Sequence, residues 1–279
     1  MNPENTTYSL SIASGKGGVG KTNLTLNLGF ALHALEKRVI LMDCDMGLAN
    51  LDILLGISPE HTIQDLLHSA LQPEDILVSL APGFDLLPAA SGVAELIEFD
   101  LDTQAVLFSK LTSVFQTYDY LFLDLGAGIS PSVLAFAEMP QERIIIITPE
   151  PTSLTDSYAF IKVLSSQTKF KHFQIIVNMV ESQKEAQLIF NRLQMACEKF
   201  LQVEIHLLGY VRQDKNLQNA VRDQKPLFLS NPQSPACRDI FTIAEKLTAN
   251  KDRQKDVINQ AKILRNTSLK KETLSPTQN

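Results

Sequence analysis

Residues 11–32, SIASGKGGVGKTNLTLNLGFAL, join an apolar run to a helix-like stretch through a turn that contains four glycines and two lysines. Glycine adopts backbone conformations that other residues avoid, so such a turn can point successive N–H groups toward one anion. One lysine beside the turn, Lys21, is the usual countercharge to bound phosphate. A second lysine inside it, Lys16, needs a separate explanation.

Two nucleotide-binding motifs share these glycines. Gly15, Gly17 and Gly20 match G-x-G-x-x-G, and Asp43 or Asp45 follows at a distance suited to a ribose contact in a dinucleotide fold. The same loop also matches G-x-x-x-x-G-K-[ST] between a strand and a helix. The second match is more specific, because a dinucleotide fold does not need the Lys-Thr pair.

The Lys-Thr pair predicts a nucleoside-triphosphate site that binds ATP and Mg²⁺. Lys21 would neutralise the β- and γ-phosphates, and the Thr22 hydroxyl would be a ligand of Mg²⁺. The positive end of the following helix would favour the same phosphates. The predicted loop contacts to the nucleotide are Gly15, Lys16, Gly17, Gly18, Val19, Gly20, Lys21, Thr22 and Asn23.

Apolar runs alternate with helix-like stretches along residues 1–249. We predict strands at 8–14, 38–45, 84–90, 118–126, 143–150, 173–180 and 205–211. We predict helices near 22–35, 62–70, 103–117, 152–167, 183–200, 214–223 and 236–249. This alternation predicts an α/β fold: one mainly parallel twisted sheet with helices on both faces. Residues 250–279 are expected to form a basic tail.

The composition is typical of a cytoplasmic protein. Hydrophobic residues make up 44% and charged residues 20% of the 279 positions. The longest apolar runs are too short to span a bilayer, and the N-terminus does not resemble a signal peptide. The three cysteines form no C-x-x-C, which argues against a disulfide framework or a thiolate-bound cluster.

Charge is unevenly distributed. Residues 251–279 contain seven basic and three acidic side chains and so carry a net charge of +4. Because the whole chain carries −6, the first 250 residues carry −10. An acidic body disfavours nonspecific DNA binding. The tail is either a segment that binds an anionic membrane or a solvated, disordered terminus. Its short apolar stripe is Val257, Ile258, Ala261 and Leu264, flanked by Lys255, Lys262 and Arg265.

The loop sequence SGKGGVGKT, residues 14–22, resembles the deviant Walker A motif of the MinD/ParA group of ATPases. The resemblance implies that Lys21 serves the nucleotide of its own chain. It also implies that Lys16 reaches across an ATP-dependent homodimer to the phosphates of the other subunit. A second positive charge would then stabilise the transferred phosphoryl group only after assembly.

Two aspartates follow the second predicted strand in LMDCDMGLANLDILLG, residues 41–56. Side chains at i and i+2 of a strand point the same way, toward the edge where α/β sheets bind ligands. The resemblance assigns Asp43 to the Mg²⁺ water network and Asp45 to positioning of the attacking water. Asn50 and Asp52 belong to the same match, without an assigned role.

A third aspartate ends the apolar run YLFLDLGAGIS, residues 120–130, which resembles Walker B followed by switch II. Asp124 would hold a Mg²⁺-bound water. Gly126 and Gly128 would allow the backbone to respond to the γ-phosphate.

More distant contacts rest on the resemblance alone. Glu150 would touch the ribose across the dimer, and Asp156 would face partners or membrane; both are also explained as helix-start residues. Asn178 matches a position that reads adenine. Arg212 lies in a loop, residues 211–214, that would close over the base, at a position where many relatives have proline.

Residues 45–57, 86–92 and 150–162 resemble the FlhG branch of the group, also called FleN or YlxH, whose members control flagellar number and placement. The implied partners are an FlhF-type GTPase, flagellar switch proteins and a FleQ-type transcription regulator, at the inner face of the cell membrane. Some members carry an activator helix for that GTPase, but only seven residues precede Tyr8 here, so the resemblance does not imply stimulation. The alternative is a ParA-type partitioning or MinD-type division-site ATPase.

Overall fold

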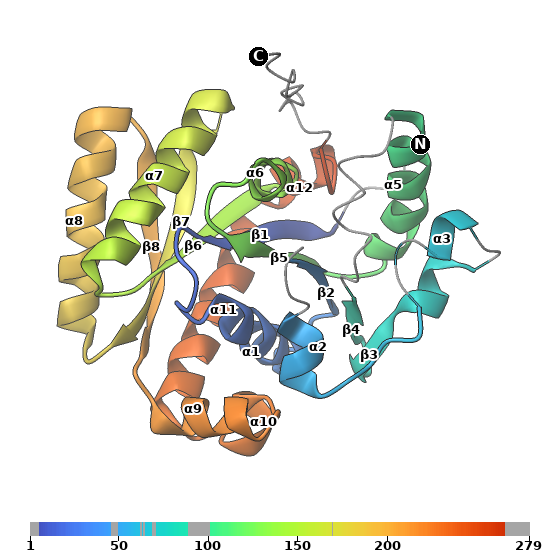
Figure 1. Cartoon of the computed structure of the whole chain (residues 1–279), viewed down its shortest axis with the longest axis horizontal. Coiled ribbons are helices and arrows are strands. Elements are labelled where there is room, and N and C mark those ends of the chain that lie inside the picture. The colour runs from blue at the N-terminus through green and yellow to red at the C-terminus, as the bar shows by residue number, and fades with distance from the viewer. Residues whose placement is uncertain are drawn as a thin grey trace, which may run out of the picture.

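The fold is built on one mixed β-sheet. The computed structural model describes residues 6–45, 50–61, 63, 65–68, 71–88, 101–168 and 170–265. The strand order of the sheet is β3-β4-β2-β5-β1-β6-β7-β8 (Figure 1). Every neighbouring pair is parallel except β3–β4. The strands are β1 (Tyr8–Ser14), β2 (Val39–Cys44), β3 (Val78–Ala81), β4 (Phe84–Leu87), β5 (Tyr120–Ala127), β6 (Glu142–Ile147), β7 (His172–Val180) and β8 (Glu204–Arg212).

Helices cover both faces of the sheet, as the α/β prediction requires (Figure 1). On one face lie α5 (Leu101–Phe115), α6 (Pro131–Glu138), α7 (Pro151–Gln167) and α8 (Gln183–Leu201). On the other lie α1 (Lys21–Ala34), α2 (Asn50–Leu55), α9 (Lys215–Arg222), α10 (Leu227–Ser230), α11 (Pro235–Arg253) and α12 (Lys255–Gln260). Two short elements, α3 (Asp65–His68) and a 3-10 turn at Pro73–Ile76, precede β3.

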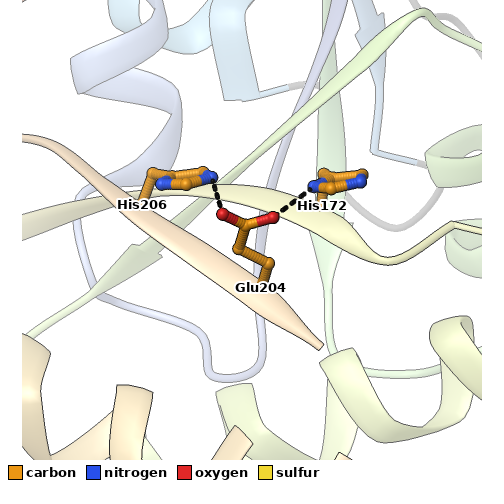
Figure 2. Close-up of side chains that lie close together, drawn as sticks. All are labelled: His172, Glu204 and His206. Carbon is orange, nitrogen blue, oxygen red and sulfur yellow. Dashed lines mark ion pairs between the residues drawn. The ribbon is translucent and has the colours of Figure 1, made fainter. Parts of the chain in front are cut away.

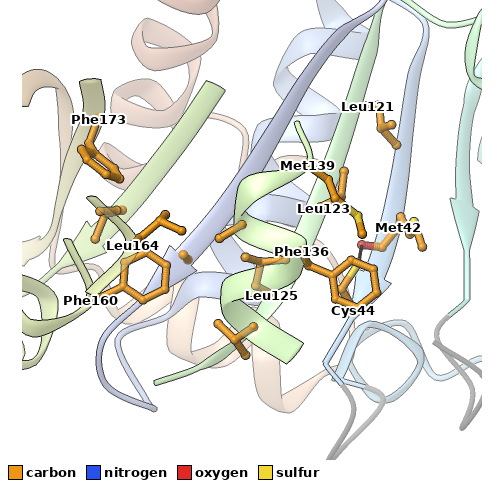
Figure 3. Close-up of a cluster of buried hydrophobic side chains, with 14 of the residues drawn as sticks. Met42, Cys44, Leu121, Leu123, Leu125, Phe136, Met139, Phe160, Leu164 and Phe173 are labelled. Carbon is orange, nitrogen blue, oxygen red and sulfur yellow. Dashed lines mark hydrogen bonds between the residues drawn. The ribbon is translucent and has the colours of Figure 1, made fainter. Parts of the chain in front are cut away.

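Each face has its own hydrophobic core, because the central strands are covered on both sides. All residues of β1 and β2 are buried. Helix α1 is buried around most of its circumference, since it lies between the sheet and α11. Figure 3 shows part of the opposite core, including Met42, Cys44, Leu121, Leu123, Leu125, Phe136, Met139, Phe160, Leu164 and Phe173.

The structure differs from the predicted elements mainly at short segments. Strand β3 has four residues and is joined to β4 by Pro82 and Gly83, where Gly83 has φ +81°. So short a turn can only join antiparallel strands. Helices α2, α6, α10 and α12 were not predicted; each has eight residues or fewer, too short for a clear helical period. Of the stretch resembling the FlhG branch at 86–92, residues 89–92 lie outside the described residues.

The chain continues to pack on the domain beyond residue 249. Helix α11 ends at Arg253, Ile258 of α12 lies in one core, and Ile263 lies in the other. The Arg265 N–H donates to the Met139 carbonyl at 2.8 Å. Of the predicted apolar stripe, Ile258 is 2% exposed whereas Val257 is 68% exposed. Residues 266–279 lie outside the described part of the chain.

Candidate nucleotide-binding site

The glycine-rich loop connects the carboxyl end of β1 to the first turn of α1. Gly18 and Gly20 have φ of +79° and +82°, a left-handed conformation that favours glycine. Gly20 is the N-cap residue of α1, which begins at Lys21. The loop therefore lies at the positive end of a 14-residue helix, where backbone N–H groups can bind phosphate.

The loop backbone also lies tightly against α7 and β7. A Cβ atom at Gly15 would lie 2.2 Å from the carbonyl carbon of Asp156, and one at Gly20 would lie 2.7 Å from Nδ2 of Asn178. That Asn178 nitrogen donates to the Val19 carbonyl at 2.8 Å. Gly15 is thus required by the close approach of the α7 backbone, and Gly20 by its positive φ and by the adjacent Asn178 side chain.

A buried charged cluster lies beneath the loop. Asp43 and Asp124 are opposite each other in the register of β2 and β5, and both are fully buried. The Lys21 ammonium is 3.0 Å from Oδ1 of Asp124, and the Thr25 hydroxyl donates to the same oxygen at 2.9 Å. The Thr22 hydroxyl is 3.4 Å from the Lys21 nitrogen. The structure thus brings together the predicted phosphate-binding lysine and all three predicted metal-binding residues.

This cluster has more acid than base. Burial first, and the Asp124 carboxylate second, raise the pKa of Asp43 from 3.8 to about 7. Backbone N–H groups of Asp45 and Leu51, which donate to Asp43 at 3.0 and 3.3 Å, and the charge of Lys21 lower this pKa but do not offset the increase.

Among the residues that the structure describes, one oxygen of the cluster lacks a hydrogen-bond partner. Oδ2 of Asp124 is buried and has no hydrogen-bond partner among the described residues. A buried carboxylate oxygen without a donor is costly, and a divalent cation or its bound water would satisfy it. The surplus negative charge favours the same cation. The residues present therefore fit Mg²⁺, and Thr22, Asp43 and Asp124 are the residues that would hold it.

The Asp43 pKa predicts how stability depends on pH without metal. An acid whose pKa is higher in the folded state opposes folding once it ionises, so this contribution falls as pH rises from about 4 to about 7. Asp43→Asn removes the ionisation. In EDTA, we expect the unfolding temperature of the variant minus that of wild type to increase by several degrees between about pH 5 and pH 8. This corresponds to a cost on the order of 1–3 kcal/mol for ionising Asp43 in the folded wild-type protein. A difference that shrinks with pH would contradict this.

Asp45 lies next to the segment that resembles switch II. Its backbone N–H donates to Asp43. A Cβ atom at Gly126 would lie 3.3 Å from Oδ1 of Asp45, so the Asp45 carboxylate borders this glycine. Gly128, two residues on, has φ +93° and donates its N–H to the Ser14 carbonyl at 3.0 Å. Asp45 is therefore placed between the acidic cluster and the 126–128 segment.

Lys16 points to α7 of its own chain instead of toward the buried cluster. Its ammonium is 2.5 Å from Oε2 of Glu150 and 3.0 Å from the Thr152 hydroxyl. Glu150 is the N-cap residue of α7 but makes no side-chain cap bond. The Lys16 and Glu150 side chains are 38% and 61% exposed. A lysine at this exposure, in a surface ion pair, is held weakly and can exchange partners.

The two predicted base-contacting residues are bound to the protein itself. Asn178 holds the loop through Val19, as described above. The Arg212 guanidinium forms two 2.8 Å hydrogen bonds with Asp239 of α11. Arg212 is the last residue of β8, which corrects the expectation that it lies in a loop, and its main-chain N–H also donates to Asp239, at 3.0 Å.

Three contributing residues were missed by the sequence analysis: Thr25, Thr152 and Asp239. Thr25 lies one helical turn after Lys21, and both side chains contact Asp124. The four-residue spacing that places them on one face of the helix is visible in the sequence. Thr152 and Asp239 act on residues far away in the chain, and no local pattern marks them.

Comparisons with known proteins agree with this geometry. The ParA family model, described as NUBPL iron-transfer P-loop NTPase, matches residues 5–248. The antiactivator FleN of Pseudomonas aeruginosa is 34% identical over 238 residues, 85% of each chain. The flagellum site-determining protein YlxH of Helicobacter pylori is 34% identical, covering 89% of this chain and 84% of the relative. The MinC:MinD cell division complex of Aquifex aeolicus aligns with TM-score 0.66 at 28% identity, covering 87% of this chain and 96% of that one.

Proposed function

The chain belongs to the ParA family of P-loop NTPases, and from this premise we propose that it is a MinD-type ATPase acting as an ATP-dependent dimerisation switch for flagellar number and placement. We infer the switch from the different positions of the two loop lysines. Lys21 is buried against Asp124, whereas Lys16 is partly exposed and contacts Glu150 and Thr152 at the start of α7. The flagellar assignment rests on the similarity to FleN and YlxH.

Within this proposal each residue has one task. Lys21 and the N–H groups of the loop bind the phosphates, and Asp45 orients the attacking water. Mg²⁺, when bound by Thr22, Asp43 and Asp124, would neutralise charge on the phosphates. Lys16 would leave its Glu150 and reach the nucleotide of the partner subunit, so that hydrolysis is slow before assembly.

The remaining nucleotide contacts are proposed on the family match. Glu150, released from Lys16, would approach the ribose across the dimer. Asn178 and the main chain near Arg212 would border the adenine. In support, Asn178 is already at the loop and the 211–214 segment is fixed to α11 by Asp239.

A genetic replacement tests the flagellar function. We expect cells that lack this chain to change their number or placement of flagella, and the wild-type chain, but not Lys21→Ala, to restore them. Normal flagella together with faulty DNA or plasmid segregation would instead favour a partitioning ATPase. A matched assay in vitro is retention on DNA in ATP at increasing salt, and we expect little retention because the first 250 residues carry −10.

Partners are also proposals. Pull-down with the chain in ATP and in ADP should separate state-dependent partners, for which an FlhF-type GTPase, flagellar switch proteins and a FleQ-type regulator are the candidates. A partner held equally in both nucleotide states would not be under control of the switch.

We further propose a cytoplasmic location with peripheral contact at an anionic membrane. Among the described residues, no helix is long and apolar enough to cross a bilayer. Ile258 and Ile263 are buried in the domain, so a membrane contact through 255–265 requires this segment to undock. Co-sedimentation with anionic and neutral vesicles, in ATP and ADP, should show binding only with ATP and anionic lipid, and less in high salt. A chain truncated after residue 265 keeps residues 255–265 and lacks residues 266–279, so its binding shows which of these two segments contacts the membrane.

A further inference from the structure

Two histidines and a glutamate meet on the surface at the beginning of β7 and β8 (Figure 2). His172 Nδ1 lies 3.1 Å from Oε2 of Glu204, and His206 Nε2 lies 3.2 Å from Oε1 of the same carboxylate. Figure 2 shows the Glu204 carboxylate between the two imidazole rings. One ligand atom from each residue can be chosen so that all three lie within 4.8 Å of one another.

The strand register produces this arrangement. His172 and Glu204 are opposite each other as the first residues of β7 and β8, and His206 follows Glu204 by two positions, on the same face of its strand. The neighbouring positions Phe173 and Ile205 point into a hydrophobic core. The trio is therefore fixed on one face by the alternation that buries the core residues.

We propose that His172, Glu204 and His206 form a site for a divalent transition metal, with Zn²⁺ as the natural occupant. Two imidazoles and one carboxylate are a frequent zinc ligand set, with water at the remaining position. Ligand atoms about 2.0–2.1 Å from a tetrahedral zinc are about 3.3 Å apart. The two observed nitrogen-to-oxygen distances, 3.1 and 3.2 Å, are close to this length, but they run to different oxygens of Glu204, so binding one metal requires the side chains to adjust around a single carboxylate oxygen.

The ligand types separate this site from the nucleotide centre. Imidazole suits Zn²⁺, Cu²⁺, Ni²⁺ and Co²⁺, whereas Mg²⁺ prefers oxygen ligands. The trio lies at the amino-terminal ends of the strands, while the glycine-rich loop follows the carboxyl end of β1. A metal here would fasten edge strand β8 to β7 far from the phosphates, and its binding should not require ATP.

The surrounding charges are mixed. Glu142 is nearby; burial raises its pKa overall, and Arg143, followed by the charges of His172 and His206, offsets part of this increase. Lys171, Arg143 and Arg265 line the same surface depression as the two histidines. The Arg143 guanidinium donates to the carbonyls of Ala137, Glu138 and Pro140, and its face lies 3.4 Å from the Phe170 ring centre, so it is directed elsewhere.

Calorimetric titration with Zn²⁺ tests the proposal. The untagged full-length chain, stripped with EDTA and desalted, would be titrated in excess Mg²⁺ so that the acidic centre is occupied. We expect one Zn²⁺ per chain, bound equally with and without ATP. Because imidazole must be deprotonated to bind metal, binding should weaken below about pH 6.

Substitutions identify the ligands. His172→Ala, His206→Ala and Glu204→Gln should each weaken binding at least about tenfold, because loss of a group that only hydrogen-bonds to a metal ligand already costs about that much. His61→Ala is the matched control, since His61 is also partly exposed and has a carboxylate, Asp65, at 3.9 Å. All four positions are at the surface, so circular dichroism should be unchanged. Absence of Zn²⁺ binding to wild type, or binding that survives both histidine substitutions, would overturn the proposal.

Discussion

Asp45→Ala should reduce ATP turnover by about 10²–10⁴-fold, the usual contribution of a group that orients or activates the attacking water. Nucleotide and metal binding should persist, because Lys21, Thr22, Asp43 and Asp124 are unchanged. The buried cluster should also persist, since it is the Asp45 backbone N–H, retained in alanine, that donates to Asp43. The variant should therefore accumulate as an ATP-bound dimer.

Phosphate release and the dimer fraction measure this effect. Asp223→Ala is a matched control, because Asp223 is an exposed aspartate at the end of α9, distant in sequence from the loop. Turnover of Asp45→Ala close to that of the control would remove Asp45 from the reaction. Loss of ATP binding would show that Asp45 holds the nucleotide instead of the water.

Lys21→Ala should abolish ATP binding at ordinary concentrations. The lysine is the single cation in contact with Asp124 among the described residues. Truncating one partner of a buried charge pair costs about 2–5 kcal/mol or more, which here adds to the lost contact with the phosphates. Two buried carboxylates would then repel an anionic ligand directly.

The same truncation weakens the fold, so binding must be measured on folded protein. Lys21→Gln keeps most of the side-chain volume and should also fail to bind, which separates charge from packing. Lys16→Ala is the matched control in the same loop: we expect its monomer to bind ATP while dimerisation and hydrolysis fail. ATP affinity near wild type in both Lys21 variants would refute the assignment of the phosphate-binding loop.

The sequence predicted best what is encoded locally or by strand register. The loop motif, the strand–helix alternation and the aspartates at strand ends are short patterns. Asp43 and Asp124 meet because β2 and β5 are neighbours in a parallel sheet whose carboxyl ends share one edge.

What the sequence did not reveal depends on long-range packing. Glu150 and Thr152 contact Lys16 across 134 and 136 positions, and Asp239 holds Arg212 because α11 packs on β8. The tail was expected to begin at residue 250, yet Ile258 and Ile263 are buried. Their burial depends on partners from both cores, and a stripe of few apolar residues does not distinguish such docking from membrane binding.

The proposed switch requires Lys16 to act in the nucleotide site of the other subunit. Mixing Lys16→Ala with Asp45→Ala tests this requirement. In a mixed dimer, the site of the Lys16→Ala chain keeps its own Asp45 and receives Lys16 from the partner, so it is complete, whereas the other site lacks both groups. Each variant alone has no complete site under either a trans or a cis role.

We therefore measure ATP turnover of the two variants separately and mixed in equal amounts before ATP is added, with mixed dimers verified by native mass spectrometry. Two inactive proteins should regain activity on mixing. Roughly a quarter of wild type is the upper limit, since random pairing would make about half of the dimers mixed, each with one complete site, and mixed dimers form only as far as a single Lys16 supports assembly. If mixed dimers form and the mixture stays as inactive as its components, Lys16 does not act across the dimer.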